Sequence, residues 1–108
     1  MTSGQKQNNA LNQHPSQRFK LVIQGITQDG HTFRPSDWAE RMSGQLCTFR
    51  NQRIVYSPLL QPKTVNGLKC VVVDCDLKQN NIHLYHEILR FARRNKLVIL
   101  RECSYNSL

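Results

Sequence analysis

Residues 80–96 form the longest stretch of this chain in which apolar side chains recur at helical spacing. The pattern predicts a helix with a broad apolar stripe, made by Ile82, Leu84, Tyr85, Ile88, Leu89, Phe91 and Ala92. A stripe of this width has to be covered by other parts of the fold. The apolar runs at 70–73 and 97–100 are typical of interior strands, so the chain is expected to pack a helix against a sheet.

Turn signals indicate one further strand and mark the start of the strand that contains residues 70–73. Residues 18–26 alternate apolar and polar side chains and predict a first strand, followed by the turn signal Asp29-Gly30. Asn66-Gly67 is the strongest turn signal in the chain and precedes a strand over residues 68–74. That strand is apolar on consecutive positions, so we expect it inside the sheet with both faces covered.

Residues 45–57 predict a hairpin with Asn51-Gln52 at its turn. This register places Phe49 directly opposite Ile54, on one face of the pair. The alternation is typical of an antiparallel pair with one buried face. We therefore expect a half-buried pair, in which the face that carries Phe49 is covered.

The stretch from Phe33 to Arg41 predicts where a short first helix begins. Pro35 suits the first helical position, because its missing N–H costs nothing there. Asp37 then places a carboxylate among the free N–H groups of the first turn. The same register pairs Phe33 with Trp38 as a hydrophobic staple and Asp37 with Arg41 as an ion pair four apart. We expect these five residues to anchor the fold.

The predicted order is strand, short helix, three strands, long helix, strand (β-α-β-β-β-α-β). Both helices on one side of a mostly antiparallel sheet of about five strands give a two-layer α+β sandwich. A ferredoxin-like arrangement is the alternative, although the meander has one strand too many for it. We expect residues 18–103 to form a single domain, residues 1–17 a disordered polar tail, and residues 104–108 a frayed end.

Residues 34–41, which read RPSDWAER, resemble the signature of a family of small, uncharacterised, mostly proteobacterial proteins. Residues 56–58 (YSP), 64–74 (TVNGLKCVVVD) and 91–97 (FARRNKL) fit the same family. The resemblance implies a bacterial, cytoplasmic, single-domain protein built on a domain of unknown function. It brings no active site to this chain.

Composition bears on where the protein works. No run approaches the roughly 20 apolar residues of a membrane span, and the N-terminus has no apolar leader segment. We therefore expect a cytoplasmic protein. The four cysteines, Cys47, Cys70, Cys75 and Cys103, form no CxxC pair. Free thiols are the expected state in a reducing compartment, and a disulfide between strands is the alternative.

Basic residues are in excess, with a net charge of +8. Residues 18–103 contain 14 of the 15 basic residues and all seven acidic ones. Such a field attracts an acidic protein, nucleic acid or anionic lipid. We expect a partner-binding surface made by basic residues of the hairpin and of the end of the long helix: Arg50, Arg53, Arg90, Arg93, Arg94 and Lys96. The alternative is that these side chains are only solvated and bind no partner.

Patterns for catalysis or metal binding are sparse. His83 and His86 lie three apart on the long helix, a spacing that can place two ligands on one metal, but no further ligand is indicated. A nucleophilic cysteine needs an exposed, electropositive setting, whereas Cys47 and Cys70 lie at strand positions expected in the core. The sequence favours a protein without cofactor and leans away from an enzyme.

We therefore expect a small, non-catalytic binding or regulatory module that uses its basic surface to recognise an acidic protein or another anionic partner. Sequence-independent nucleic-acid binding is the alternative, although the predicted central strands carry no aromatic residues for stacking bases. A metal- or thiol-dependent enzyme is the third hypothesis. A monomer or weak homodimer is expected.

Overall fold

A computed structural model describes residues 17–105 of the chain. Most of the tail predicted for residues 1–17 and of the frayed end predicted for residues 104–108 lies outside the described residues, but Gln17 begins the first strand and residues 104 and 105 end the last one. The elements, in chain order, are β1 (Gln17–Thr27), α1 (Trp38–Ser43), the 3-10 helix η1 (Gly44–Leu46), β2 (Thr48–Arg50), β3 (Arg53–Val55), β4 (Leu60–Val65), β5 (Leu68–Asp74), α2 (Leu77–Asn80), α3 (Ile82–Arg94) and β6 (Leu97–Tyr105).

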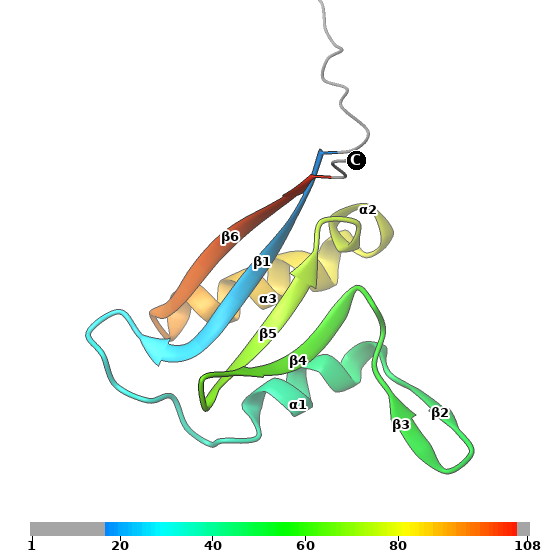
Figure 1. The fold of residues 1–108 in the computed structure, drawn as a ribbon, viewed down its shortest axis with the longest axis horizontal. Coiled ribbons are helices and arrows are strands. Elements are labelled where there is room, and N and C mark those ends of the chain that lie inside the picture. Colours follow the sequence, from blue (N-terminus) through cyan, green and yellow to red (C-terminus); the bar gives the residue numbers. More distant parts are fainter. Residues whose placement is uncertain (1–16, 106–108) are drawn as a thin grey trace, which may run out of the picture.

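Four strands form one antiparallel sheet in the order β4-β5-β1-β6 (Figure 1). The chain passes from β1 through α1 to β4, and from β5 through α3 to β6, each time skipping one strand of the sheet. When the β2–β3 hairpin is set aside, these two split β-α-β units make the ferredoxin-like arrangement. The predicted α+β class, with a mostly antiparallel sheet and one short and one long helix, is confirmed.

The strand order differs from the predicted one in two ways. In place of one sheet of about five strands there are two sheets: the predicted hairpin forms a separate two-stranded sheet, β2–β3, and residues 60–65 supply an additional edge strand, β4, to the four-stranded sheet. Alternation shows which residues share a face, but it does not show which strands pair. The strand β6, predicted to be central, lies at the other edge and continues to Tyr105.

The core lies between the sheet and the helices. Helix α1 contacts β4 and β5, helix α3 contacts β6, and both helices lie on the same face of the sheet (Figure 1). Burial of each large apolar side chain contributes about 1.5–3 kcal/mol. The most deeply buried large side chains are Ile23, Leu60, Val71, Val73, Leu77, Ile88 and Leu97.

Helix α1 begins at Trp38, three residues later than predicted. The residues before it form a turn, in which the Trp38 N–H donates to the carbonyl of Pro35 at 3.2 Å. The side chain of Asp37 caps no first-turn N–H and instead accepts from Nε of Arg41 at 2.9 Å, which confirms the predicted pair. Phe33 meets Trp38 edge to face at 5.7 Å between ring centroids, but outside the helical register that a staple needs.

Both predicted two-residue turns are present. Asn51 and Gln52 have φ of 49° and 62°, and Asn66 and Gly67 have φ of 53° and 79°. Positive φ at both central residues is the type I′ geometry, which matches the twist of the flanking strands. The predicted register also holds, because Phe49 pairs with Ile54 across the first of these turns.

The long helix α3 is shorter than the predicted stretch of residues 80–96, and the short helix α2 precedes it. The side chain of Asn81 accepts from the Leu84 N–H at 3.1 Å and so caps the start. Most of the predicted stripe faces the sheet, whereas Ile82, at the first helical position, is exposed. In the described part of the chain, no helix is long and apolar enough to cross a membrane.

Candidate functional site

The β2–β3 hairpin stands away from the four-stranded sheet (Figure 1). Its strands are three residues each, and the turn at Asn51 and Gln52 joins them directly. A two-stranded hairpin of this length is marginal by itself in water. The rest of the fold therefore has to hold it at its base, and its two faces remain open.

One face of the hairpin exposes large apolar side chains. Phe49 is 71% exposed and Ile54, directly opposite, is 55% exposed. The prediction that this face of the pair is covered is therefore wrong. The hairpin projects beyond the sheet and the helices (Figure 1), so the described residues leave most of the pair uncovered. An aromatic and a β-branched residue side by side in water form an apolar contact surface of the kind found at protein interfaces.

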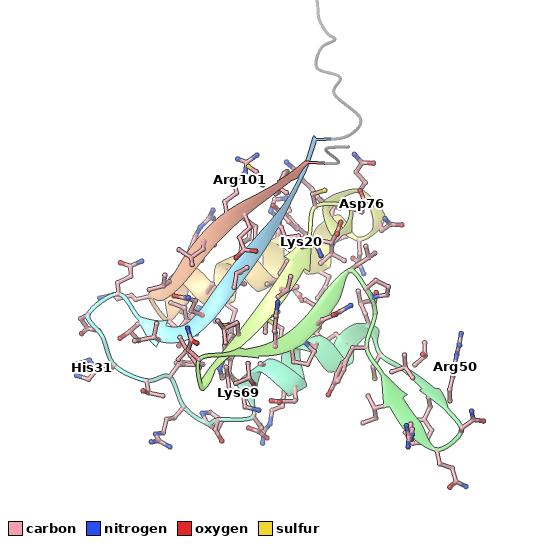
Figure 2. All side chains as sticks on the ribbon, in the orientation of Figure 1. Lys20, His31, Arg50, Lys69, Asp76 and Arg101 are labelled. Carbon is pink, nitrogen blue, oxygen red and sulfur yellow. The ribbon has the colours of Figure 1, made fainter. Side chains whose placement is uncertain are left out.

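The other face of the hairpin is basic. Arg50 pairs directly with Arg53, and like charges opposite each other destabilise a strand pair. Figure 2 shows Arg50 extending from the hairpin. No acidic residue occurs between Glu40 and Asp74, so the sequence around the hairpin contains no negative charge to offset these arginines. The hairpin thus combines an apolar face with a basic face.

A hollow of about 330 Å³ lies at the base of the basic face. Arg50 and Val55 line it from the hairpin, while Leu46 lines it from η1. The remaining lining residues come from β2 and from the loop that leads to β4: Thr48, Tyr56, Ser57 and Pro58. The hollow gives an incoming side chain a concave place beside a guanidinium group.

The basic residues of α3 lie elsewhere. Arg90, Arg93, Arg94 and Lys96 are all exposed, at the end of the helix that leads into β6. This end of α3 and the hairpin lie at opposite sides of the molecule (Figure 1). The structure therefore does not bring these residues together with Arg50 and Arg53 into one surface, and the predicted surface divides into two basic groups.

The two histidines of α3 are exposed, and the His86 ring meets Tyr85 edge to face at 5.8 Å between centroids. Within residues 17–105, neither His83 nor His86 belongs to a group of three residues able to share a metal ion. The one such group in that range was not indicated by the sequence and consists of Asp74, Cys75 and Asp76. Asp74 there accepts a hydrogen bond from the Asp76 N–H at 2.9 Å, which shapes the turn into α2.

Comparison with known proteins places the chain in a family. A family model described as a protein of unknown function, DUF3579, matches residues 17–102. The chain belongs to this family. The predicted membership of an uncharacterised family is therefore confirmed, and the DUF3579 region extends from β1 into β6, with the hairpin inside it.

One solved structure resembles the DUF3579 fold described above. It is a solution structure described as the first structural representative of its family, and it is 38% identical to this chain with a TM-score of 0.69. The match covers 78% of this chain and 79% of that one. No curated protein matches the chain. The comparisons therefore support the fold and the family but assign no activity.

The four cysteines of the chain are all free. Cys70 is completely buried, as expected, and burial raises the pKa of its thiol above the ordinary value. A raised pKa keeps the group protonated at neutral pH, which makes it a poor nucleophile. Cys47 and Cys75 are half-buried, and Cys103 is exposed. The predicted core position thus holds for Cys70 and only in part for Cys47.

Proposed function

We propose that this chain is a small, non-catalytic binding module that docks an acidic partner protein through the β2–β3 hairpin. The observation that carries the proposal is the exposure of Phe49 and Ile54 on a projecting, basic hairpin. Aromatic residues, phenylalanine included, and arginines are enriched in protein interfaces. The hairpin offers both kinds of side chain on two faces of one short element.

Energetic considerations support the same role. An exposed Phe-Ile pair gains little burial in the free protein, and the facing arginines Arg50 and Arg53 repel each other. Neither feature helps the domain to fold. Both become favourable when a partner covers the apolar face and brings carboxylates to the guanidinium groups.

An acidic protein fits the hairpin better than nucleic acid does. A cross-strand apolar pair matches the apolar centre of a protein interface, while binding of single strands relies on several aromatic side chains in a row. Phe49 is the one aromatic residue of the hairpin. The central strands β1 and β5 have no aromatic side chain on the sheet face that lies away from the helices, where bases would stack.

The partner experiment compares two hairpin variants with a matched control. Four forms of the chain are immobilised and used to capture proteins from a lysate of the source organism: the wild type, Phe49→Ala/Ile54→Ala, Arg50→Glu/Arg53→Glu, and Arg93→Glu/Arg94→Glu. The last variant carries the same charge change at the other basic group. We expect an acidic protein to be retained by the wild type and by the α3 variant, and to be lost by both hairpin variants.

Two results would contradict the proposal. Equal loss of the partner from the α3 variant would mean that overall charge, and not the hairpin, holds it. Hairpin-dependent binding of single-stranded RNA or DNA, with an affinity that falls steeply between about 50 and about 200 mM salt, would favour the nucleic-acid alternative. Circular dichroism of each variant establishes that the fold is kept.

We further infer a cytoplasmic location and a monomer or weak homodimer. Four free cysteines support a reducing compartment. Fractionation of the source cells and sedimentation of the purified chain at two concentrations are the corresponding measurements.

A further inference from the structure

A second concave site lies on the helix side of the molecule, away from the hairpin faces. It is a pocket of about 330 Å³ between α1, α3 and the loop that follows β1. Pockets from about 300 Å³ upward, with apolar walls and a few polar groups, are typical of small-molecule sites. The lining residues are Phe33, Pro35, Trp38, Arg41, Met42, Gln45 and Phe91.

Three aromatic rings from three parts of the chain make the walls. Trp38 and Phe91 stack with an interplanar angle of 15° and 6.2 Å between centroids. Phe33 meets each of them edge to face at 5.7 Å. Each ring therefore contacts the other two. Phe33 and Phe91 are only half-buried, which leaves aromatic surface open for a further ring.

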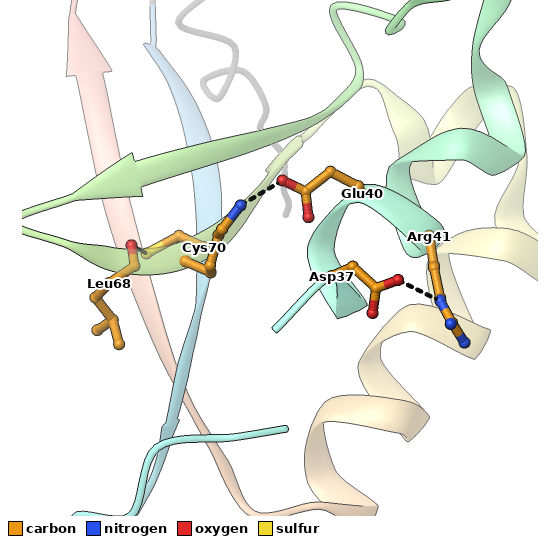
Figure 3. Close-up of polar contacts among 6 residues, drawn as sticks. Asp37, Glu40, Arg41, Leu68 and Cys70 are labelled. Atoms are coloured by element: carbon orange, nitrogen blue, oxygen red, sulfur yellow. Dashed lines mark hydrogen bonds and ion pairs between the residues drawn. The ribbon is translucent and has the colours of Figure 1, made fainter. Parts of the chain in front are cut away.

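Arg41 and Gln45 supply the polar side chains of the pocket lining. Arg41 and Gln45 are four residues apart, in α1 and in η1. Nε of Arg41 donates to Oδ2 of Asp37 at 2.9 Å, so the Nε edge of the guanidinium group faces Asp37. Figure 3 shows the side chains of Arg41 and Glu40 leaving the helix in different directions. The terminal nitrogens of Arg41 can then bind a carboxylate with two parallel hydrogen bonds.

We propose that this pocket binds a small molecule that consists of an aromatic ring and a carboxylate. The ring packs against Phe33, Trp38 and Phe91, and the carboxylate pairs with the guanidinium of Arg41. The Asp37 carboxylate beside Arg41 disfavours a dianion such as phosphate, so a monoanionic carboxylate fits better. The pocket is separate from the hairpin, so a failure to bind this ligand would not contradict the proposed partner binding by the hairpin.

Trp38 supplies the measurement, because it is the only tryptophan of the chain and gives a single indole N–H signal. Indole-3-acetate is titrated into the full chain, and the shift of that signal is followed by NMR. We expect saturable shifts with a Kd between about 10 µM and about 1 mM, the range for a ligand of this size. Acetate, which lacks the ring, and 3-methylindole, which lacks the carboxylate, are expected to bind at least about tenfold more weakly.

Two variants test the role of the guanidinium. Arg41→Gln is expected to weaken indole-3-acetate binding by at least about tenfold, while Arg93→Gln, which removes an exposed charge outside the pocket, leaves it unchanged. Equal binding of 3-methylindole, no effect of Arg41→Gln, or the absence of saturable shifts up to about 10 mM would each overturn the proposal. The proposal would also be overturned if a short peptide with an aromatic residue between two aspartates bound to the pocket while indole-3-acetate did not.

Discussion

The indole ring of Trp38 packs directly against the backbone of Gly25. A Cβ on Gly25 would lie 2.9 Å from Nε1 of Trp38 and 2.8 Å from the carbonyl oxygen of Lys69. Contacts this short are not tolerated, and the carbonyl oxygen belongs to a strand that is paired on both sides. The first strand therefore needs a glycine at this position so that α1 can lie close to the sheet.

Replacement of Gly25 by alanine is expected to lower the free energy of unfolding by about 1–3 kcal/mol, the usual cost of forcing extra volume into a packed core. Gly44→Ala is the control, because Gly44 has φ of −63° and a Cβ there would meet nothing within 4 Å. The control should be neutral or slightly stabilising. Urea unfolding of both variants, followed by circular dichroism, measures the difference, and equal stabilities would mean that the close contact is absent.

Trp38→Ala is expected to cost about 3–5 kcal/mol, because it removes a large ring from the core and leaves a cavity. Only 4% of Trp38 is exposed, and the ring supports both Phe33 and Phe91. Phe49→Ala serves as the comparison, since an exposed ring contributes little to folding and its removal should stay within about 0.5 kcal/mol. Unfolding by urea with far-ultraviolet circular dichroism avoids the lost tryptophan signal. A Trp38→Ala protein as stable as the wild type would show that the ring is not part of the core.

Local features of this fold could be predicted from the sequence because their causes are local. Asn66-Gly67 forms its turn because asparagine and glycine accept positive φ. Asp37 and Arg41 pair because residues four apart on a helix are neighbours. The register of Phe49 against Ile54 follows from the position of the turn between them.

Features that depend on the packing of distant segments could not be predicted in the same way. Phe49 and Ile54 share a face, as predicted, but whether another layer covers that face depends on where the hairpin goes. The pocket needs Phe91 of α3 beside Phe33 and Trp38, and this contact arises because both helices lie on one side of the sheet. The late start of α1 was missed because Pro35 suits a turn as well as a first helical position.

Lys96 follows the end of α3 with φ of 56°, a left-handed conformation that disfavours any residue with a Cβ. Its N–H donates to the carbonyl of Arg93 at 3.1 Å, as in a helix C-cap that normally uses glycine. Lys96→Gly is therefore expected to raise the free energy of unfolding by about 1 kcal/mol. Arg93→Gly, inside the same helix, should lower it by about 1 kcal/mol. Urea denaturation gives both values, and a loss of stability in both variants would contradict the left-handed geometry.

The ion pair between Glu40 and Lys69 ties α1 to β5, and it makes stability depend on pH. Lys69 Nζ lies 2.6 Å from Oε2 of Glu40, and this hydrogen bond is the main cause that lowers the pKa of Glu40 below its ordinary value of 4.5. Because the pKa of Glu40 is lower in the folded state, the ion pair stabilises the fold fully at pH values above the unfolded-state pKa. This stabilisation is lost as the pH falls through the folded-state pKa. Both side chains are more than a third exposed, so solvent screening limits the contribution to about 0.5 kcal/mol.

A double-mutant cycle with Glu40→Gln, Lys69→Gln and the combined variant isolates this interaction. At pH 7 we expect a coupling free energy of about 0.5 kcal/mol that becomes smaller as salt is added. When the pH falls through the lowered pKa of Glu40, the carboxylate is protonated and the coupling should vanish. Urea denaturation of the four proteins at several pH values supplies the measurement. A coupling free energy that stays constant down to the lowest pH would mean that the contact between Glu40 and Lys69 does not depend on the charge of Glu40. The packing of α1 on the sheet would then hold the two side chains together.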